Sequence, residues 1–135
     1  MPTREYRGSC HCGAVQYACA IDWGRGTSRC NCSVCSKSRF WKTVIPSAAF
    51  RLLAGEGALV QYRFGRGSIV HHFCGRCGVK TFGTGEHPAL GGPFHAVNVA
   101  CLDDLTEAEL AALPVRYEDG RHDHWERAPA ETHHL

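Results

Sequence analysis

Two closely spaced cysteines stand in the stretch Cys74-Gly75-Arg76-Cys77-Gly78, in the middle of a chain of 135 residues. A C-x-x-C knuckle followed by glycine turns the backbone so that both thiolates face one ion, and a closed tetrahedral zinc site then needs two more sulfurs. Cys10 and Cys12, near the start of the chain, are available for this. The spacing therefore predicts a structural zinc ion that ties the first strand to the middle of the chain, with the ligands Cys10, Cys12, Cys74 and Cys77.

A third cluster, Cys30-Asn31-Cys32-Ser33-Val34-Cys35, offers three further sulfurs. Three thiolates leave a zinc ion one ligand short of tetrahedral, and an open position is typical of a catalytic or ligand-exchanging site. The alternative is a closed second site whose fourth ligand is one of four histidines: His11, His71, His72 or His95. Three negative ligands disfavour hydrolysis by zinc hydroxide and favour a thiol substrate, which coordination deprotonates. The cluster thus predicts a second zinc site with Cys30, Cys32 and Cys35 as catalytic residues.

The composition narrows the class of partner. Hydrophobic residues make up 44% of the chain, charged residues 21%, and the net charge is +2. These values are ordinary for a globular protein and indicate neither a nucleic-acid nor a membrane surface. Nine cysteines, an odd number crowded into short sets, disfavour a secreted disulfide framework, and the first residues lack the apolar run of a signal peptide. We therefore expect a cytoplasmic protein whose partners are small molecules.

The chain reads as one zinc-stapled domain over residues 1–135, with a core of about residues 6–126. Alternating apolar residues separated by glycine-rich turns predict a mainly-β fold of antiparallel strands. One segment differs, because Thr106-Glu107-Ala108-Glu109 has the form of a capping box before Leu110 and Leu113 and predicts a single short helix that ends by Pro114. The predicted strands are 14–19, 40–45, 50–53, 58–64, 68–73, 79–82 and 95–102.

The three cysteine clusters, in this order, resemble the glutathione-dependent formaldehyde-activating (GFA) family, also called the CENP-V/GFA family. Asp119-Gly120-Arg121-His122-Asp123 is similar to a tail found in many members, whereas Val79-Lys80 replaces a hydroxyl residue that follows the knuckle in relatives. The resemblance implies an Mss4-like β-tent of packed antiparallel sheets, with a structural and a labile zinc ion on the seven cysteines named above. It also implies a carbon-sulfur lyase that, in the reverse sense, joins glutathione and formaldehyde to form S-hydroxymethylglutathione.

Basic residues surround the three-cysteine cluster. Arg29, Lys37 and Arg39, together with Lys42, are candidates to receive the two carboxylates of glutathione and to lower thiolate pKa values. Solvated surface charge is the competing interpretation of each. The predicted partners are accordingly a small-molecule thiol and an aldehyde.

Two other functions compete with this enzyme. One is a zinc-stabilised binding module without catalysis, and the other is an enzyme like methionine sulfoxide reductase, which needs an exposed nucleophilic cysteine outside the metal sites. Only Cys19 and Cys101 lie outside the clusters, and each continues an apolar alternation that predicts burial. His71 and His72 must point to opposite faces of a strand, so we expect one to be packed and the other solvated. The last few residues are expected to be frayed.

Overall fold

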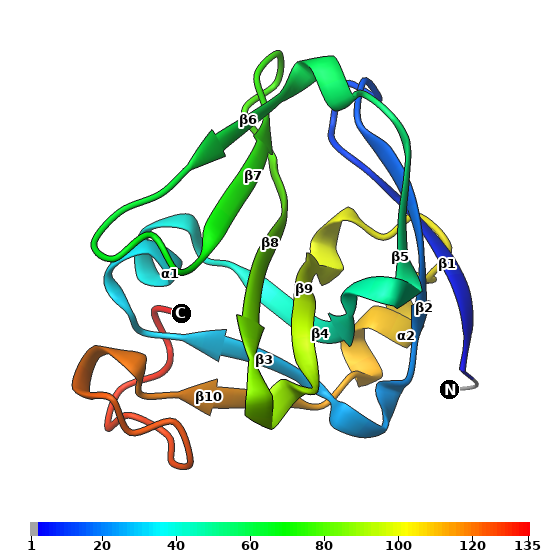
Figure 1. Ribbon diagram of the computed structural model, residues 1–135. Helices are drawn as coiled ribbons and strands as arrows, with labels where there is room; N and C mark the ends of the chain where they lie inside the picture. The colour runs from blue at the N-terminus through cyan, green and yellow to red at the C-terminus, as the bar shows by residue number, and fades with distance from the viewer. Residues whose placement is uncertain (1–2) are drawn as a thin grey trace.

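The computed structural model describes residues 3–135, which fold into two β-sheets and two short α-helices (Figure 1). The three-stranded sheet has the order β1 (Arg4–Ser9), β2 (Gln16–Ile21) and β5 (Phe50–Ala54). The seven-stranded sheet has the order β10 (Val115–Glu118), β3 (Thr27–Cys30), β4 (Trp41–Pro46), β9 (Gly92–Asn98), β8 (Lys80–His87), β7 (Val70–Cys74) and β6 (Leu59–Tyr62). All strand pairs are antiparallel except β10 with β3. The predicted mainly-β architecture of packed sheets is confirmed.

The inner face of the large sheet packs against the small sheet. Val97 lies opposite Thr43 on one side and Phe82 on the other, so these residues share that face. The Phe82 ring is 4.6 Å from Phe50 and 5.9 Å from Tyr17, centroid to centroid, and both partners belong to the small sheet. Since Tyr17 and Val97 are fully buried, each contributes about 1.5–3 kcal/mol of hydrophobic stabilisation. This interface is the main core of the domain.

The outer face of the large sheet supports helix α1 (Ser33–Ser38). Val44, Ala96, Gly83 and His71 lie opposite one another across four strands and therefore point to this side. Phe40, directly after α1, is buried in a cluster that includes Ala96, Val44 and Cys35. The helix and its cysteines are thus held against the sheet face that the small sheet leaves free.

The sequence predicted a single helix, and that prediction did not include α1. Its sequence, Ser33-Val34-Cys35-Ser36-Lys37-Ser38, has three serines and no apolar periodicity, so helix propensity is low. Its N-cap residue is Cys32 and its C-cap residue is Arg39, whose φ of 52° is left-handed, as at many helix C-termini. The helix forms because the C-x-C-x-x-C loop and Phe40 pack locally.

The predicted helix is confirmed as α2 (Glu107–Ala112), and its capping box is complete: the Thr106 hydroxyl accepts from the Glu109 N–H at 3.1 Å, and the Glu109 carboxylate accepts from the Thr106 N–H at 3.0 Å. None of the helices in residues 3–135 is long and apolar enough to span a bilayer.

Two further predictions were wrong. Leu135 is buried, and its carbonyl accepts a hydrogen bond from the Arg39 guanidinium at 3.4 Å, so the end of the chain is docked and not frayed (Figure 1). His71 and His72 do point to opposite faces of β7, but both are buried, because Phe64 and Lys80 pack on His71 and Phe82 stacks on His72. The predicted start at residue 1 lies outside the described residues.

Candidate metal centre

The four-cysteine cluster joins the β1–β2 connection to the β7–β8 turn. The Sγ atoms of its members all lie within 4.8 Å of one another, and the separations Cys10–Cys12 and Cys12–Cys74 are both 3.7 Å. A tetrahedral zinc with bonds of about 2.3 Å has sulfur–sulfur edges of about 3.8 Å, so the donors fit the ion in type and spacing. The predicted four-sulfur site is therefore assembled as Cys10, Cys12, Cys74 and Cys77.

Backbone N–H groups stabilise negative charge on these sulfurs. The N–H of Val15 donates to Cys10 Sγ and that of Arg76 to Cys74 Sγ, both at 3.3 Å. The backbone N–H of Cys12 is the main group that lowers the pKa of Cys77, to about 6. Gly78 closes the knuckle with a φ of 78°, a left-handed conformation that glycine adopts without strain. The pKa values of Cys74 and Cys77 are thus lowered toward the thiolate, the form that binds a metal, whereas the pKa of Cys12 is raised to about 11.

The three-cysteine cluster lies where β3 passes into α1. Cys30 ends the strand, Cys32 is the N-cap residue and Cys35 lies in the helix. The Cys32 N–H donates to Cys30 Sγ at 3.4 Å. The side chains of Cys30 and Cys35 lower the pKa of Cys32, as do backbone N–H groups of Cys35 and Val34, whereas interaction with Cys30 and Cys32 raises the pKa of Cys35. The three thiols therefore form one interacting set in which Cys32 is the first to ionise.

This set is looser than the four-cysteine cluster. Within residues 3–135, one group of histidine, cysteine or carboxylate side chains brings its ligand atoms within 4.8 Å of one another, and it is the four-cysteine group. No histidine among the described residues completes such a group with Cys30, Cys32 and Cys35. The second zinc site stays a prediction, and so does the choice between an open fourth position and one filled by a histidine.

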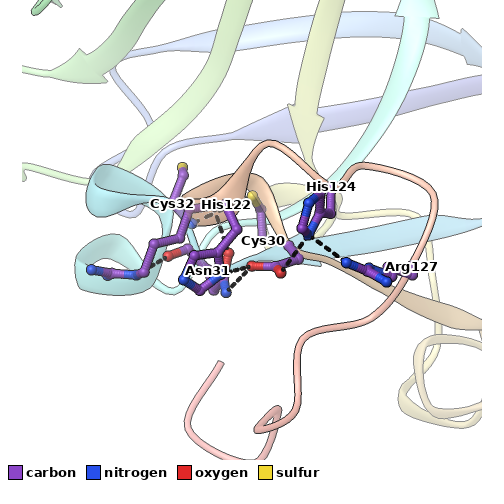
Figure 2. Close-up of polar contacts among 8 residues, drawn as sticks. Cys30, Asn31, Cys32, His122, His124 and Arg127 are labelled. Carbon is purple, nitrogen blue, oxygen red and sulfur yellow. Dashed lines mark hydrogen bonds and ion pairs between the residues drawn. The ribbon is translucent and has the colours of Figure 1, made fainter.

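A buried polar network holds the three-cysteine loop from below (Figure 2). The Asn31 side chain donates to Asp119 Oδ1 at 2.8 Å and accepts from the Arg121 N–H at 2.9 Å. His122 Nδ1 contacts the same Asp119 oxygen at 2.8 Å. The hydrogen bond from Asn31 is the main cause that lowers the pKa of Asp119, which keeps this buried carboxyl ionised. Asn31 thereby fixes the cysteine loop to the C-terminal segment.

Gly120 brings its backbone against the sulfur of Cys30. A Cβ atom at this position would lie 2.5 Å from Cys30 Sγ and 2.6 Å from the Trp125 ring. Cys30 is buried as a result, while Cys32 and Cys35 are half-buried. The C-terminal segment therefore closes one side of the loop and leaves its helix side more open.

Two lysines face the three-cysteine cluster from the outer face of the sheet. Lys42 forms an ion pair with Glu118 at 2.6 Å. The Lys80 Nζ lies 3.8 Å from the centre of the Phe40 ring and contacts His71 Nδ1 at 2.8 Å. Burial lowers the pKa of Lys80, and the negative charges of Cys35 and Cys32 oppose that shift. The ammonium group of Lys80 therefore interacts favourably with negative charge on Cys35 and Cys32.

Sequence reasoning missed this role of Lys80, which it treated only as a departure from a pattern. Strict alternation would place Lys80 on the inner face with Phe82. An irregularity in the β7–β8 pairing brings Lys80 opposite Phe73 and turns it outward. Alternation alone cannot locate such a bulge.

The predicted glutathione contacts occupy different surroundings. The Arg29 guanidinium donates to the Arg39 carbonyl at 3.2 Å and lies 5.2 Å from the Trp41 ring. Arg39 is exposed and reaches Leu135, and Lys37 is exposed on α1. All three surround α1, but two of them already have protein partners.

The remaining cysteines are buried, as predicted. Burial is the main cause that raises the pKa of Cys19 and of Cys101, each to about 12. Such thiols are poor nucleophiles at neutral pH. The arrangement therefore disfavours chemistry of the methionine sulfoxide reductase type.

Comparison with known proteins agrees with this arrangement of cysteines. The model of a family described as glutathione-dependent formaldehyde-activating enzyme matches residues 5–118, which include all three clusters. The crystal structure of a Rhodobacter sphaeroides protein is similar at a TM-score of 0.68 and 28% identity, over 81% of this chain and 98% of that one. The segment that covers Cys30 lies beyond the residues matched by the family model.

Proposed function

Because the chain belongs to the glutathione-dependent formaldehyde-activating enzyme family, we propose that it joins the thiol of glutathione to formaldehyde or another small aldehyde. In the opposite direction the same reaction is that of a carbon-sulfur lyase. The observation that carries the proposal is the second set of thiols: Cys30, Cys32 and Cys35 take no part in the four-cysteine cluster, yet the chain surrounds them with a buried network and with lysines.

The two cysteine sets have different tasks in this proposal. The four-cysteine cluster would hold a structural zinc, with a contribution to folding on the order of 10–16 kcal/mol at neutral pH. The three-cysteine set would hold a second ion, which keeps a guest thiol deprotonated when bound. Seven reduced thiols are needed, so we expect the protein to work in a reducing compartment such as the cytoplasm.

The chain's own residues would bind and orient glutathione. Its two carboxylates need cations, and Lys37 is exposed in the last turn of α1, two residues after the half-buried Cys35. Arg39 directly follows α1 and Arg29 donates to its carbonyl, so both would need to exchange their present partners. Lys37 is therefore the strongest of the three predicted contacts.

A pair of cysteine variants tests the proposal. Cys32→Ser and Cys35→Ser should lower the rate at which glutathione and formaldehyde combine, measured by NMR exchange, by at least about 100-fold, because the group that activates the thiol is lost. Circular dichroism should show both variants folded. Cys74→Ser is the matched control and should unfold, because it opens the four-sulfur site. If the Cys32 and Cys35 variants unfold to the same extent, the division of tasks is wrong.

A binding module without catalysis is the second candidate, and one feature favours it. The edge strand β6 and the loop after it expose Val60, Tyr62, Phe64 and Ile69. Exposed apolar patches often mark protein contacts. A wild-type protein that carries both zinc ions but leaves the reaction at its uncatalysed rate would support this candidate over the enzyme.

A further inference from the structure

His71 and Lys80 form a pair on the outer face of the large sheet, beside the three-cysteine cluster. The Lys80 Nζ lies 2.8 Å from His71 Nδ1 and 3.8 Å from the centre of the Phe40 ring. Phe40 is the buried residue that packs with Cys35. Among residues 3–135, no carboxylate forms an ion pair with Lys80. The pair therefore joins the sheet to the site through Phe40.

Contact with Lys80 fixes which nitrogen of His71 carries the proton. An ammonium group has three N–H donors and no acceptor, so His71 Nδ1 must accept this hydrogen bond. The proton of the neutral imidazole then lies on Nε2. Burial is the main cause that lowers the pKa of His71, to about 4, so the ring is neutral at physiological pH. His71 consequently presents an Nε2–H donor.

That donor has no partner. His71 is only 7% exposed, and its Nε2 atom is buried. This atom forms no hydrogen bond with the described residues. An unmet buried donor is destabilising, and such groups in native proteins call for an explanation. The comparable His72, on the inner face of the same strand, contacts the Thr84 hydroxyl at 2.9 Å. The Nε2 atom of His72 therefore has a hydrogen-bond partner among the described residues, whereas that of His71 has none.

The His71–Lys80 pair lies within electrostatic reach of the cysteines that would hold the substrate. The negative charge of Cys32 acts on His71, and the charges of Cys32 and Cys35 act on Lys80. Toward solvent, the His71 ring stacks on the exposed Phe64 at 5.7 Å. His71 is thus covered by an exposed aromatic side chain and lies within reach of the charge on Cys32.

We propose that the Nε2–H of His71 binds the oxygen of the aldehyde, and that Lys80 is a positioning residue which holds His71 in the tautomer that donates. This inference rests on the proposed function. As the thiolate sulfur forms the new carbon–sulfur bond, the π electron pair of the carbonyl moves onto oxygen. The His71 donor stabilises that growing charge. The oxygen then takes a proton from water, which replaces the proton that the thiol released to solvent.

Kinetics give the first test. His71→Phe should lower kcat for the reaction of glutathione with formaldehyde by about 100-fold, as expected for the loss of one oxyanion donor, and leave the KM for glutathione within about twofold. His71→Gln keeps an N–H donor and should recover part of the rate. His72→Gln is the matched control on the opposite face and should keep the wild-type kcat per folded molecule. Equal loss in the His71 and His72 variants would mean a purely structural role.

Nitrogen-15 NMR of the zinc-loaded protein gives a readout that does not depend on turnover. His71 should show a protonated Nε2 and a bare Nδ1, and Lys80→Met should mix the two tautomers. Adding S-hydroxymethylglutathione, prepared from glutathione and formaldehyde, should shift the Nε2–H signal, while S-methylglutathione, which lacks the oxygen, should not.

The outcomes separate the two proposals. A shift without acceleration by the wild type overturns the enzyme and keeps the oxygen site. Acceleration without a shift, or with a proton on Nδ1, overturns the role of His71. A metal-bound Nε2 signal also overturns it, because His71 would then be the fourth ligand of the second ion. If there is neither a shift nor acceleration, both proposals fall.

Discussion

At the scale of single residues, contacts that involve the backbone decide whether the three-cysteine loop keeps its shape. Asn31 stands between Cys30 and Cys32 in the sequence, and its side chain forms hydrogen bonds with Asp119 and with the backbone N–H of Arg121. Gly120 is small enough to let its backbone touch Cys30. Neither residue is a ligand, but both set where the sulfurs lie.

The Gly120→Ala variant measures this contact. Its methyl group would overlap Cys30 Sγ, so we expect a loss of about 1–3 kcal/mol in the free energy of unfolding and weaker binding of the second zinc ion. Urea unfolding and metal analysis after mild chelation give the two values. Gly57→Ala is the control, because nothing lies within 4 Å of its added methyl group and its φ is ordinary. Unchanged zinc retention in Gly120→Ala would show that Trp125 alone absorbs the overlap.

At the scale of elements, the capping box shows how a short helix is stabilised by its first residues. Helix α2 has only six residues, so its own hydrogen bonds are few. Thr106 and Glu109 satisfy each other's backbone N–H groups at its start.

We expect Thr106→Ala to lower the free energy of unfolding by about 1 kcal/mol, because the N–H of Glu109 loses its acceptor. Urea denaturation checks this value. Thr106→Ser retains a hydroxyl and should stay close to the wild type. A serine variant as unstable as the alanine variant would attribute the loss to the Thr106 methyl group instead.

The elements that could be predicted are those whose signal is local. Alternation located β2, β4, β5, β6 and β7 within about two residues, and the capping box located α2. Strands β8 and β9 were located with ends that differ by up to five residues, and β1 was not predicted. Strands β3 and β10 were also missed, because they have four residues each and are defined by their pairing with one another, 88 residues apart. Helix α1 was missed because packing of Phe40, and not propensity, produces it. The outward turn of Lys80 depends on a bulge, which no pattern in the sequence encodes.

The cysteine ligands were more predictable than the groups around them. C-x-C and C-x-x-C spacing places both sulfurs of each pair at one point, so the four-sulfur site required only the correct combination of two pairs. The network of Asn31 and Asp119 depends on a long-range contact between two loops, and the His71–Lys80 pair depends on strand register. Tertiary structure alone reveals these.

At the scale of the whole molecule, the four-cysteine cluster joins the two sheets at one end. Cys10 and Cys12 follow β1 of the small sheet, and Cys74 and Cys77 border the turn between β7 and β8 of the large one. Removing that ion should therefore separate the sheets and not merely loosen a loop.

Stepwise chelation checks this expectation. A mild chelator should remove one zinc ion per chain with no change in circular dichroism, and added glutathione should slow that loss. A strong chelator should then remove the second ion and unfold the domain, because the ion supplies on the order of 10–16 kcal/mol, comparable to the total stability of a small domain. A single tightly held ion per chain contradicts the existence of the second site.

The contact of Asn31 with Asp119 spans 88 residues and has a consequence for biosynthesis. A nascent polypeptide exposes Cys30, Cys32 and Cys35 early, but the segment that shields Cys30, around Gly120 and Trp125, leaves the ribosome much later. All four cysteines of the other cluster emerge before that segment does. Metal insertion during translation should therefore follow a fixed order, and a prematurely terminated product would carry three unprotected sulfurs vulnerable to oxidation.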